Sequence, residues 1–370
     1  MFGKLFLGET KKLVRPKALI TIAVICVVFF ILFAVVYNIN LDAIVRDLEI
    51  MIEGIENGSP VGEEKTEEEI AEELGYRNAD FVKLANPDNV DAILADLRLA
   101  RDEAAFLNKQ KGTKGSYGGE IYYYDCAITL LEYMKANDIY GDINVEGYKS
   151  YYSMRTAESF ALSYFEFVVA ILSIYGIVTA AGLYADEYAK GTIKLVMLRP
   201  VGRNMLTTAK LLALFSHLVV LLGLTTLASY VYGAIAFGSV ATEKVFVVFN
   251  SQSVFASTSG AVVLYKMFFK TVGMLSFVSL AFAIGTISRK KTLGIVITLI
   301  IYLGIVSAIF SAFGGERFVF STNTDFSSYF GMTTAVMDGA NFYIALPVYL
   351  AYIAAIFASL YLTVKKRDII

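Results

Sequence analysis

The sequence predicts an all-α polytopic membrane protein with six transmembrane helices, both termini in the cytoplasm, and a mainly helical extracytoplasmic domain between the first two helices. Hydrophobic residues make up 56% of the 370 residues, and the mean hydropathy is +0.59. Soluble domains hold only about 45–50% apolar residues. The charged residues, 18% of the chain, stand in blocks between long uncharged runs. This pattern is typical of membrane-spanning helices and excludes a soluble enzyme or a disordered protein.

Six uncharged runs approach the roughly 20 residues that a helix needs to cross a bilayer. The predicted spans cover residues 18–37, 160–185, 211–237, 271–288, 292–313 and 342–364. A seventh uncharged stretch, residues 245–265, contains a polar cluster that lipid would leave without hydrogen-bond partners. We expect this stretch to contribute two β-rich pieces, KVFVVF and SVFAST, on either side of a polar turn at residues 250–252.

The basic residues predict which ends of the spans face the cytoplasm, because short cytoplasmic segments collect Lys and Arg. Sixteen of the 32 Lys and Arg residues fall in four segments: residues 1–17, 186–210, 289–291 and 365–370. Six spans place all four segments on one side, and a seventh span would not. The opposite side then carries residues 38–157, 238–270 and 314–341.

Residues 1–17 are predicted to form an amphipathic helix in the cytoplasmic interface of the membrane. Phe2, Leu5, Phe6 and Leu13 fall on one side of a helix, while the lysines fall elsewhere. The apolar run that follows is too long for a secretory signal, and FAVVYNIN offers no small-residue cleavage pattern. We therefore expect an anchor, with a frayed basic tail as the alternative to the interfacial helix.

The segment between the first two spans, residues 38–157, carries 24 acidic and 12 basic side chains. It is predicted to be an acidic domain outside the cytoplasm. Apolar residues keep helical spacing over residues 41–55, which predicts that the first span continues as a helix beyond the membrane. Asn86-Pro87 predicts a helix start before a periodic stretch over residues 90–104, and residues 121–134 repeat the pattern.

Patterns of catalytic chemistry are absent from the sequence. Cys26 and Cys126 have no spacing that suits a disulfide framework or a metal site, and His217 is the single histidine. The segment KGTKGSYGG lacks the Lys-Ser/Thr pair of a phosphate-binding loop. We therefore expect a protein that is not an enzyme, binds no cofactor or metal itself, and has no nucleic-acid partner.

The most informative segment is the predicted cytoplasmic loop YADEYAKGTIKLVMLRPVGRNMLTTAK, residues 184–210. Three apolar residues share one face at helical spacing: Ile193, Val196 and Met197. Arg199-Pro200 forces the chain out of the helix. An apolar stripe on a short helix facing the cytosol either lies on the membrane or fits a groove on a partner. A plain basic juxtamembrane loop is the alternative on physical grounds alone.

This loop resembles the corresponding loop in the permease subunit of type-2 ABC exporters. The shared pattern is an acidic residue, a Gly-Thr pair, an apolar patch ending in Arg-Pro, a following Arg, and a Lys that opens the next span. The matching positions are Glu187, Gly191, Thr192, Arg199, Pro200, Arg203 and Lys210. In that family the loop holds a coupling helix that docks on a separate ATP-hydrolysing subunit. Six spans and a preceding amphipathic helix are also usual there, so the resemblance in topology covers the whole chain.

The resemblance implies a transmembrane permease of an ATP-driven exporter in a bacterial plasma membrane. Its implied partners are a cytosolic ABC ATPase that binds ATP and Mg, a second permease copy or a homologous permease, and membrane lipid. An apolar path suits an amphipathic or hydrophobic substrate such as a peptide, lipid or drug. The large domain after the first span departs from the short loop of smaller family members and leaves the substrate open.

Two other functions remain as alternatives. A sodium exporter of the same family would need several buried carboxylates, and Glu166 is the one candidate in the predicted spans. A membrane sensor with an acidic ligand-binding ectodomain would need an output domain, but no predicted cytoplasmic segment exceeds about 25 residues.

Three ionisable residues lie nearest the outer ends of the second and fourth predicted spans: Glu166, Lys266 and Lys270. Each side chain can extend to the lipid headgroups. The alternative interpretation is that Glu166 pairs with a lysine across the outer mouth of the path, since an unpaired charge there would be costly.

The six-span topology predicts how two introduced cysteines react in intact cells. In a background without the native cysteines, Ser59→Cys should react with an impermeant maleimide, because residues 38–157 are predicted to lie outside. Thr292→Cys should react only after the membrane is permeabilised. Labelling of both positions, or of neither, in a protein present at normal levels would contradict the model.

Overall fold

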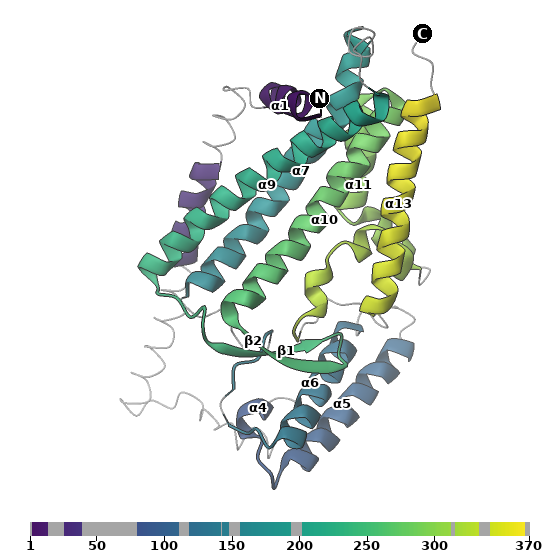
Figure 1. Cartoon of the computed structure of the whole chain (residues 1–370). Coiled ribbons are helices and arrows are strands. Elements are labelled where there is room, and N and C mark those ends of the chain that lie inside the picture. Colours follow the sequence, from purple (N-terminus) through teal and green to yellow (C-terminus); the bar gives the residue numbers. More distant parts are fainter. Residues whose placement is uncertain are drawn as a thin grey trace.

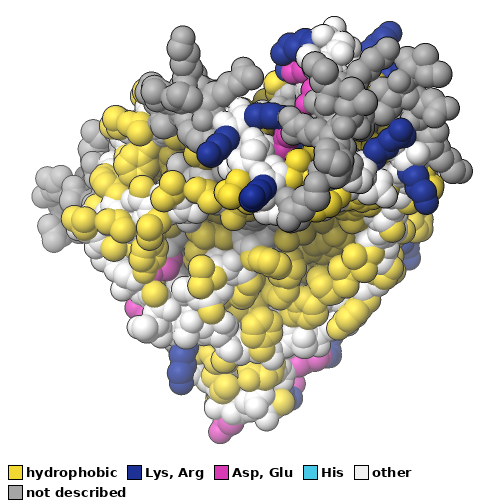
Figure 2. All heavy atoms as spheres, turned by 45° about the horizontal axis from the view of Figure 1, so that its top comes forward, with side chains coloured by type: hydrophobic (Ala, Val, Ile, Leu, Met, Phe, Trp, Pro, Cys, Tyr) yellow, Lys and Arg dark blue, Asp and Glu magenta, His cyan; other side chains and the backbone are white. Residues whose placement is uncertain are grey.

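The structure is a computed structural model of a mainly helical protein, in which a tilted bundle of long helices carries a two-stranded sheet and a small helical domain at one end (Figure 1). It describes residues 2–13, 26–38, 80–110, 118–141, 143–147, 156–193, 202–311, 315–332 and 341–366. Among these described residues, four helices are long and apolar enough to cross a membrane: α7 (Ala157–Ala189), α9 (Arg203–Ala236), α10 (Ser259–Ser288) and α13 (Phe342–Lys366). Hydrophobic side chains dominate the middle of the space-filling view (Figure 2).

All three of α7, α9 and α10 begin earlier than the sequence predicts, and α7 also ends later. α7 starts at Ala157, where Thr156 accepts a hydrogen bond from the backbone N–H of Ser159 at 3.2 Å. α10 starts at Ser259 rather than at residue 271, so Lys266 and Lys270 lie within it. The predicted starts of α9 and α10 lie after Lys210 and Lys270, because charged residues usually mark the ends of a span. In the structure Lys210, Lys266 and Lys270 form ion pairs with other parts of the chain, so the helices continue through them.

The helix predicted over residues 292–313 is interrupted. α11 (Lys291–Tyr302) ends at a turn, and α12 (Ile305–Ser311) follows it. Gly304 lies in the left-handed region with φ of 75°, and its N–H donates to the carbonyl of Ile301 at 3.1 Å. A left-handed glycine of this kind ends a helix by satisfying its last carbonyls. Of the first predicted span, the helix Cys26–Asn38 is described.

α7 is the central helix of the bundle and contacts α9, α10 and α11. It approaches α10 closely at Gly285, where a Cβ would stand 2.4 Å from the carbonyl oxygen of Ala181. Small residues at such crossings let helix backbones pack tightly in lipid, where no hydrophobic effect drives association. On the opposite side, the Cys26–Asn38 helix packs its rings on α7, and Tyr164 donates a hydrogen bond to the carbonyl of Cys26 at 3.2 Å.

The stretch between α9 and α10 forms the expected β-hairpin. β1 (Lys244–Phe249) and β2 (Ser253–Thr258) pair antiparallel, from Lys244 opposite Thr258 to Phe249 opposite Ser253. This prediction is confirmed, including the polar turn at residues 250–252. β1 also bridges Val145 on one side and its end bridges Phe330, so it lies at the centre of three chain segments.

The described part of the acidic segment is a helical hairpin, α5 (Val90–Gln110) and α6 (Gly118–Asn137), preceded by the short α4 (Phe81–Leu84). The side chain of Asn86 accepts hydrogen bonds from the N–H groups of Asp88 and Asn89 at 3.0 Å each, which confirms the predicted helix start in this region. The predicted apolar stripes meet in a core between the two helices. Residues 39–79, with the predicted continuation of the first span, lie outside the described residues.

Residues 315–332, predicted as part of an outer loop, fold back against the bundle. Three short 3-10 turns, η3 (Glu316–Phe318), η4 (Ser321–Asn323) and η5 (Phe326–Tyr329), contact α10 or α13. The carbonyl of Thr324 approaches α10 so closely that a Cβ on Gly273 would meet it at 2.8 Å. This return brings polar and aromatic side chains to the flank of α10.

Candidate functional site at the basic end of the bundle

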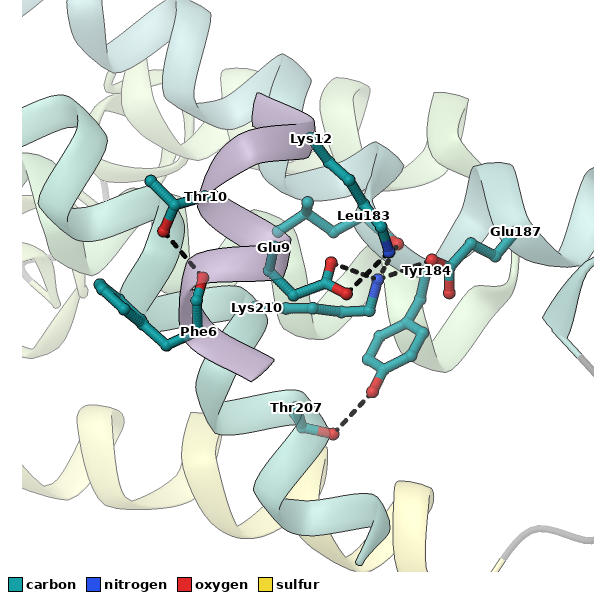
Figure 3. A network of polar contacts seen from close by, with 9 residues as sticks. All are labelled: Phe6, Glu9, Thr10, Lys12, Leu183, Tyr184, Glu187, Thr207 and Lys210. Carbon is teal, nitrogen blue, oxygen red and sulfur yellow. Dashed lines mark hydrogen bonds and ion pairs between the residues drawn. The ribbon is translucent and has the colours of Figure 1, made fainter. Parts of the chain in front are cut away.

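The short helix α1 (Phe2–Leu13) lies across the start of α9 at the end of the bundle opposite the sheet (Figures 1 and 3). Leu5 packs with Leu206 and Ala209 in a small apolar cluster. Glu9 follows Leu5 by one helical turn, so its carboxylate is directed at α9 as well. The prediction of a helix here is confirmed, and its inner face contains one acid among apolar residues.

A buried charge cluster joins α1, α7 and α9 (Figure 3). Lys210, only 2% exposed, places its Nζ 2.7 Å from Oε1 of Glu187 and 3.4 Å from Oε2 of Glu9. Glu9 is 4% exposed and also pairs with Lys12 at 2.7 Å. Buried charges are tolerated only when they are paired and hydrogen-bonded, and removing one partner costs several kcal/mol. The cluster therefore fixes where these three helix ends lie relative to one another.

The acid of α1 remains ionised in this cluster. Burial by itself raises the pKa of Glu9, but the ammonium groups of Lys210 and Lys12 outweigh burial and hold the pKa below its usual 4.5. A carboxyl group whose pKa is depressed in the folded state stabilises that state above its ordinary pKa. This contribution is lost as the pH falls through the lower, folded-state pKa.

A second contact at the same level ties α7 to α9. The hydroxyl groups of Tyr184 and Thr207 lie 3.0 Å apart, and Thr207 also donates to the carbonyl of Arg203, the first residue of α9, at 3.0 Å. The ring of Tyr184 stands 5.1 Å from Nζ of Lys210 and so adds a cation–π contact to the cluster.

The end of α7 is also held from the side of α10 and α11. Lys291 pairs with Asp186 at 3.6 Å, and the guanidinium of Arg289 lies 4.9 Å from the ring centre of Tyr188. Helix α7 ends at Ala189, and two residues later Gly191, with φ of 68°, takes the left-handed conformation that glycine adopts without strain. The chain therefore leaves α7 from a position fixed on two sides.

The predicted coupling residues divide into two groups. Glu187 and Lys210 come together, Thr192 donates to the carbonyl of Glu187 at 3.4 Å, and Ile193 is buried. Gly191 follows the end of α7, and Arg203 begins α9. The other positions, Val196, Met197, Arg199 and Pro200, and with them most of the predicted short helix, lie outside the described residues.

Glu9 belongs to this site but is not among the residues predicted for it. A signal for it exists, because Glu9 is the one acidic residue among residues 1–17. It also follows Leu5 at the i, i+4 spacing that puts both on one helix face. An isolated acid on the apolar face of a basic helix indicates a buried cationic partner.

The three predicted outer-mouth charges form two separate pairs. Glu166 pairs with Lys270 at 3.0 Å, and Lys270 lies 3.5 Å from Asp325 of the returning segment. Lys266 does not take part and instead forms a buried ion pair with Glu146. Glu166 is also not the one candidate for a buried carboxylate in the long helices, because Glu158, near the start of α7, is 0% exposed while Glu166 is 47% exposed.

The remaining candidate side chains are packed. His217 is buried and lies 3.4 Å from the hydroxyl of Tyr175. Burial raises the pKa of the Cys126 thiol to about 12, which makes it an inert core residue of α6. Among the described residues no group of three His, Cys, Asp or Glu side chains is placed to hold a metal ion.

The buried cluster predicts a large difference between two lysines. Lys210→Met should lower the free energy of unfolding by about 3–5 kcal/mol, because it leaves two carboxylates without their shared cation. Lys12→Met, at an exposed position, should cost less than about 1 kcal/mol. Adding Glu9→Gln to Lys210→Met should recover part of the loss. Unfolding of the purified protein in detergent measures the free energy of unfolding of all three variants. Equal decreases for Lys210→Met and Lys12→Met would contradict the role of Lys210 as the centre of the cluster.

Comparisons with known proteins find a family and a distant relative that resemble this chain. No solved structure matches it. The "Uncharacterized protein YhcI" of Bacillus subtilis (strain 168) is 22% identical to it over 211 residues, which cover 56% of this chain. The match covers 64% of that protein, so the chain spans less than two thirds of its relative. Residues 126–370 match the family described as "Protein of unknown function (DUF2705)", a segment that includes all four long helices and the pair of Glu187 with Lys210. Because the match extends over more than half of the chain, the protein belongs to the DUF2705 family.

Proposed function

We propose that this chain is the transmembrane permease subunit of an ATP-driven exporter, of the type-2 ABC kind, that moves an amphipathic or hydrophobic substrate. The observation that supports it best is the buried cluster of Glu9, Lys210 and Glu187. A passive basic loop between two spans needs no buried ion pairs. Here the cluster holds the end of α7 and the start of α9 firmly, so that the short loop between them is presented to a partner from a fixed base.

The partner in this proposal is a cytosolic ABC ATPase, which binds ATP and Mg. In this proposal the loop between α7 and α9 binds a groove on that ATPase through Val196 and Met197, which the sequence predicts on one apolar face, while Ile193 is buried at the start of the loop. A force on the loop passes through Glu187 and Lys210 to both α7 and α9, because the cluster joins their ends. Movement of the loop then becomes movement of two spans.

The proposal includes six spans and a path framed by two permease copies, or by this chain and a homologous permease. The Cys26–Asn38 helix belongs to the first span, and α11 with α12 forms the fifth. Glu166 and Asp325 are each about half exposed on the flank of α7 and α10. Charges within apolar helices face water or protein rather than lipid. This favours an aqueous path or a second subunit beside that flank.

Sodium export fits the site less well. The most buried carboxylates near the sheet end are already engaged, Glu146 by Lys266 and Glu158 by three hydrogen-bond donors. A sensor function has one feature in its favour, since Thr129 of α6 donates to the carbonyl of Ser251 at 2.8 Å and links the helical domain to the hairpin. Co-purification of an ATPase separates the transporter from the sensor.

The apolar stripe of the loop predicts a specific loss of coupling. Val196→Asp would put a charge in the desolvated contact and should abolish both ATPase association and stimulated hydrolysis, because buried apolar anchors carry most interface energy. Glu187→Ala should lower stimulated hydrolysis with a smaller loss of association, since it frees the base of the loop. Val196→Leu and Lys194→Gln are the matched controls and should retain both. Pull-down with tagged permease and the hydrolysis rate are the measurements, and wild-type values for Val196→Asp would reject the coupling role.

The outer pairs predict a rescue by charge exchange. Glu166→Gln should lower transport about fivefold, as expected for a partly exposed pair worth about 1 kcal/mol. Lys270→Gln should lower it further, because it loses Asp325 as well. The double exchange Glu166→Lys with Lys270→Glu should restore part of the activity. Lys244→Gln, on the exposed end of β1, is the control. Full transport in both single variants would leave these side chains without a role in the path.

A further inference from the structure

An apolar groove of about 520 Å³ lies between α7, α9 and α10, towards the sheet end of the bundle. Its floor is made by apolar side chains of α7 and α10, chiefly Phe165, Val263 and Met267, with Leu222 of α9. At its rim stand Leu227 of α9 and Leu264 of α10, which are 61% and 69% exposed. The groove therefore opens onto the apolar outer surface of helices that can span a membrane.

The groove extends along α9. It follows this helix from Val219 to Tyr230, which is about 16 Å at the helical rise of 1.5 Å per residue. Gly223 lies midway, and a Cβ built on it meets no atom within 4 Å. The space beside Gly223 is therefore open, and a linear hydrocarbon chain can lie along this length of α9.

One end of the groove is polar and acidic. Glu158, which is 0% exposed, accepts hydrogen bonds from Ser239 at 2.6 Å, from Tyr230 at 3.2 Å and from the N–H of Val240 at 3.0 Å. No Lys or Arg of the described residues forms an ion pair with it, and the carboxyl group lines the groove with hydrogen-bond donors as its partners. Ser239 itself is exposed and can accept a hydrogen bond from outside.

We propose that this groove binds one hydrocarbon chain of an amphiphile from the surrounding bilayer, with an ammonium head at the acidic end. The chain would lie along Gly223 from Val219 outwards. The head would donate hydrogen bonds to the hydroxyl oxygens of Ser239 and Tyr230, above the carboxylate of Glu158. An anionic head would be repelled by that carboxylate. The site is independent of ATPase coupling and goes beyond the proposed function.

The absence of tryptophan from the chain gives a direct test. Val219 lines the groove, while Val220 is its neighbour at the same depth and does not line it. Val219→Trp and Val220→Trp are each placed in nanodiscs and titrated with a long-chain primary amine brominated at the end of its chain. Bromine quenches tryptophan fluorescence on contact. We expect saturable quenching of Val219→Trp, and only the weak linear quenching of free membrane partition for Val220→Trp.

Two further comparisons test the tail and the head of the ligand. Gly223→Leu in the Val219→Trp protein should remove the saturable quenching, whereas Ala228→Leu, which adds similar bulk to an exposed position of α9, should retain it. The amine should half-saturate at a roughly tenfold lower mole fraction than the brominated alcohol of equal length, as a carboxylate a few ångströms from the head would give. Glu158→Gln should reduce the ratio of amine affinity to alcohol affinity to near one. Ser239→Ala is a milder change and should reduce this ratio as well.

Different results would contradict the groove and the ammonium head. Equal quenching of the two reporters, or saturable quenching that survives Gly223→Leu, would overturn the groove as a binding site. Equal affinity for amine and alcohol in the Val219→Trp protein would overturn the assignment of an ammonium head. Melting temperatures of the variants show which remain folded, and Ser239→Ala tests the head if Glu158→Gln does not fold.

Discussion

The close crossing of α7 and α10 is the contact on which the rest of the bundle depends. A Cβ at Gly285 would overlap the backbone of Ala181, and one at Gly294 of α11 would stand 2.9 Å from the Ala181 side chain. Helices α7 and α10 and the first turn of α11 thus meet at Ala181. In lipid, such tight backbone packing replaces the hydrophobic effect as the force that holds helices together. Because the crossing fixes α7, it also fixes the last turn of α7, where Asp186 and Glu187 find their partners.

Buried ion pairs join segments that are remote in the sequence at both ends of this packed bundle. At one end Lys210 of α9 lies between Glu9 of α1 and Glu187 of α7, and at the other Lys266 of α10 pairs with Glu146. Desolvation offsets much of the attraction in pairs of this kind, so they add little net stability. Their effect is positional, because any other arrangement would leave a charge buried alone. The proposed coupling of loop movement to α7 and α9 rests on this property.

Local patterns predicted the local elements well. The amphipathic spacing of residues 2–13, the alternation in KVFVVF and SVFAST, and the helical stripe after Asn86 each depend on neighbouring residues, and each element is present. What the sequence did not reveal depends on distant partners. The true start of α10 was hidden because Lys266 and Lys270 look like the edge of a span until Glu146 and Glu166 are seen beside them. The break at Gly304 was hidden as well, since a glycine in an apolar run carries no sign of its left-handed conformation.

The candidate site shows the same division. Glu187, Lys210 and the loop between them were visible as a motif, and the structure brings the first two together. Glu9 was not visible as a partner, because nothing in residues 1–17 indicates which later helix they cover. The same holds for Asp325, which reaches Lys270 only because residues 315–332 turn back along α10.

The strand β1 also has a consequence for how the protein loses its structure. Its backbone bonds to residues 144–146 on one side, while Gly331 and Asn250 link it and its turn to the returning segment. Asn250 further accepts a hydrogen bond from the N–H of Phe342, the first residue of α13, at 2.8 Å. The helical hairpin of α5 and α6 and the membrane helices therefore share one set of backbone bonds. Neither part can unfold without removing the other's support, so heating should produce a single cooperative transition rather than two separate ones.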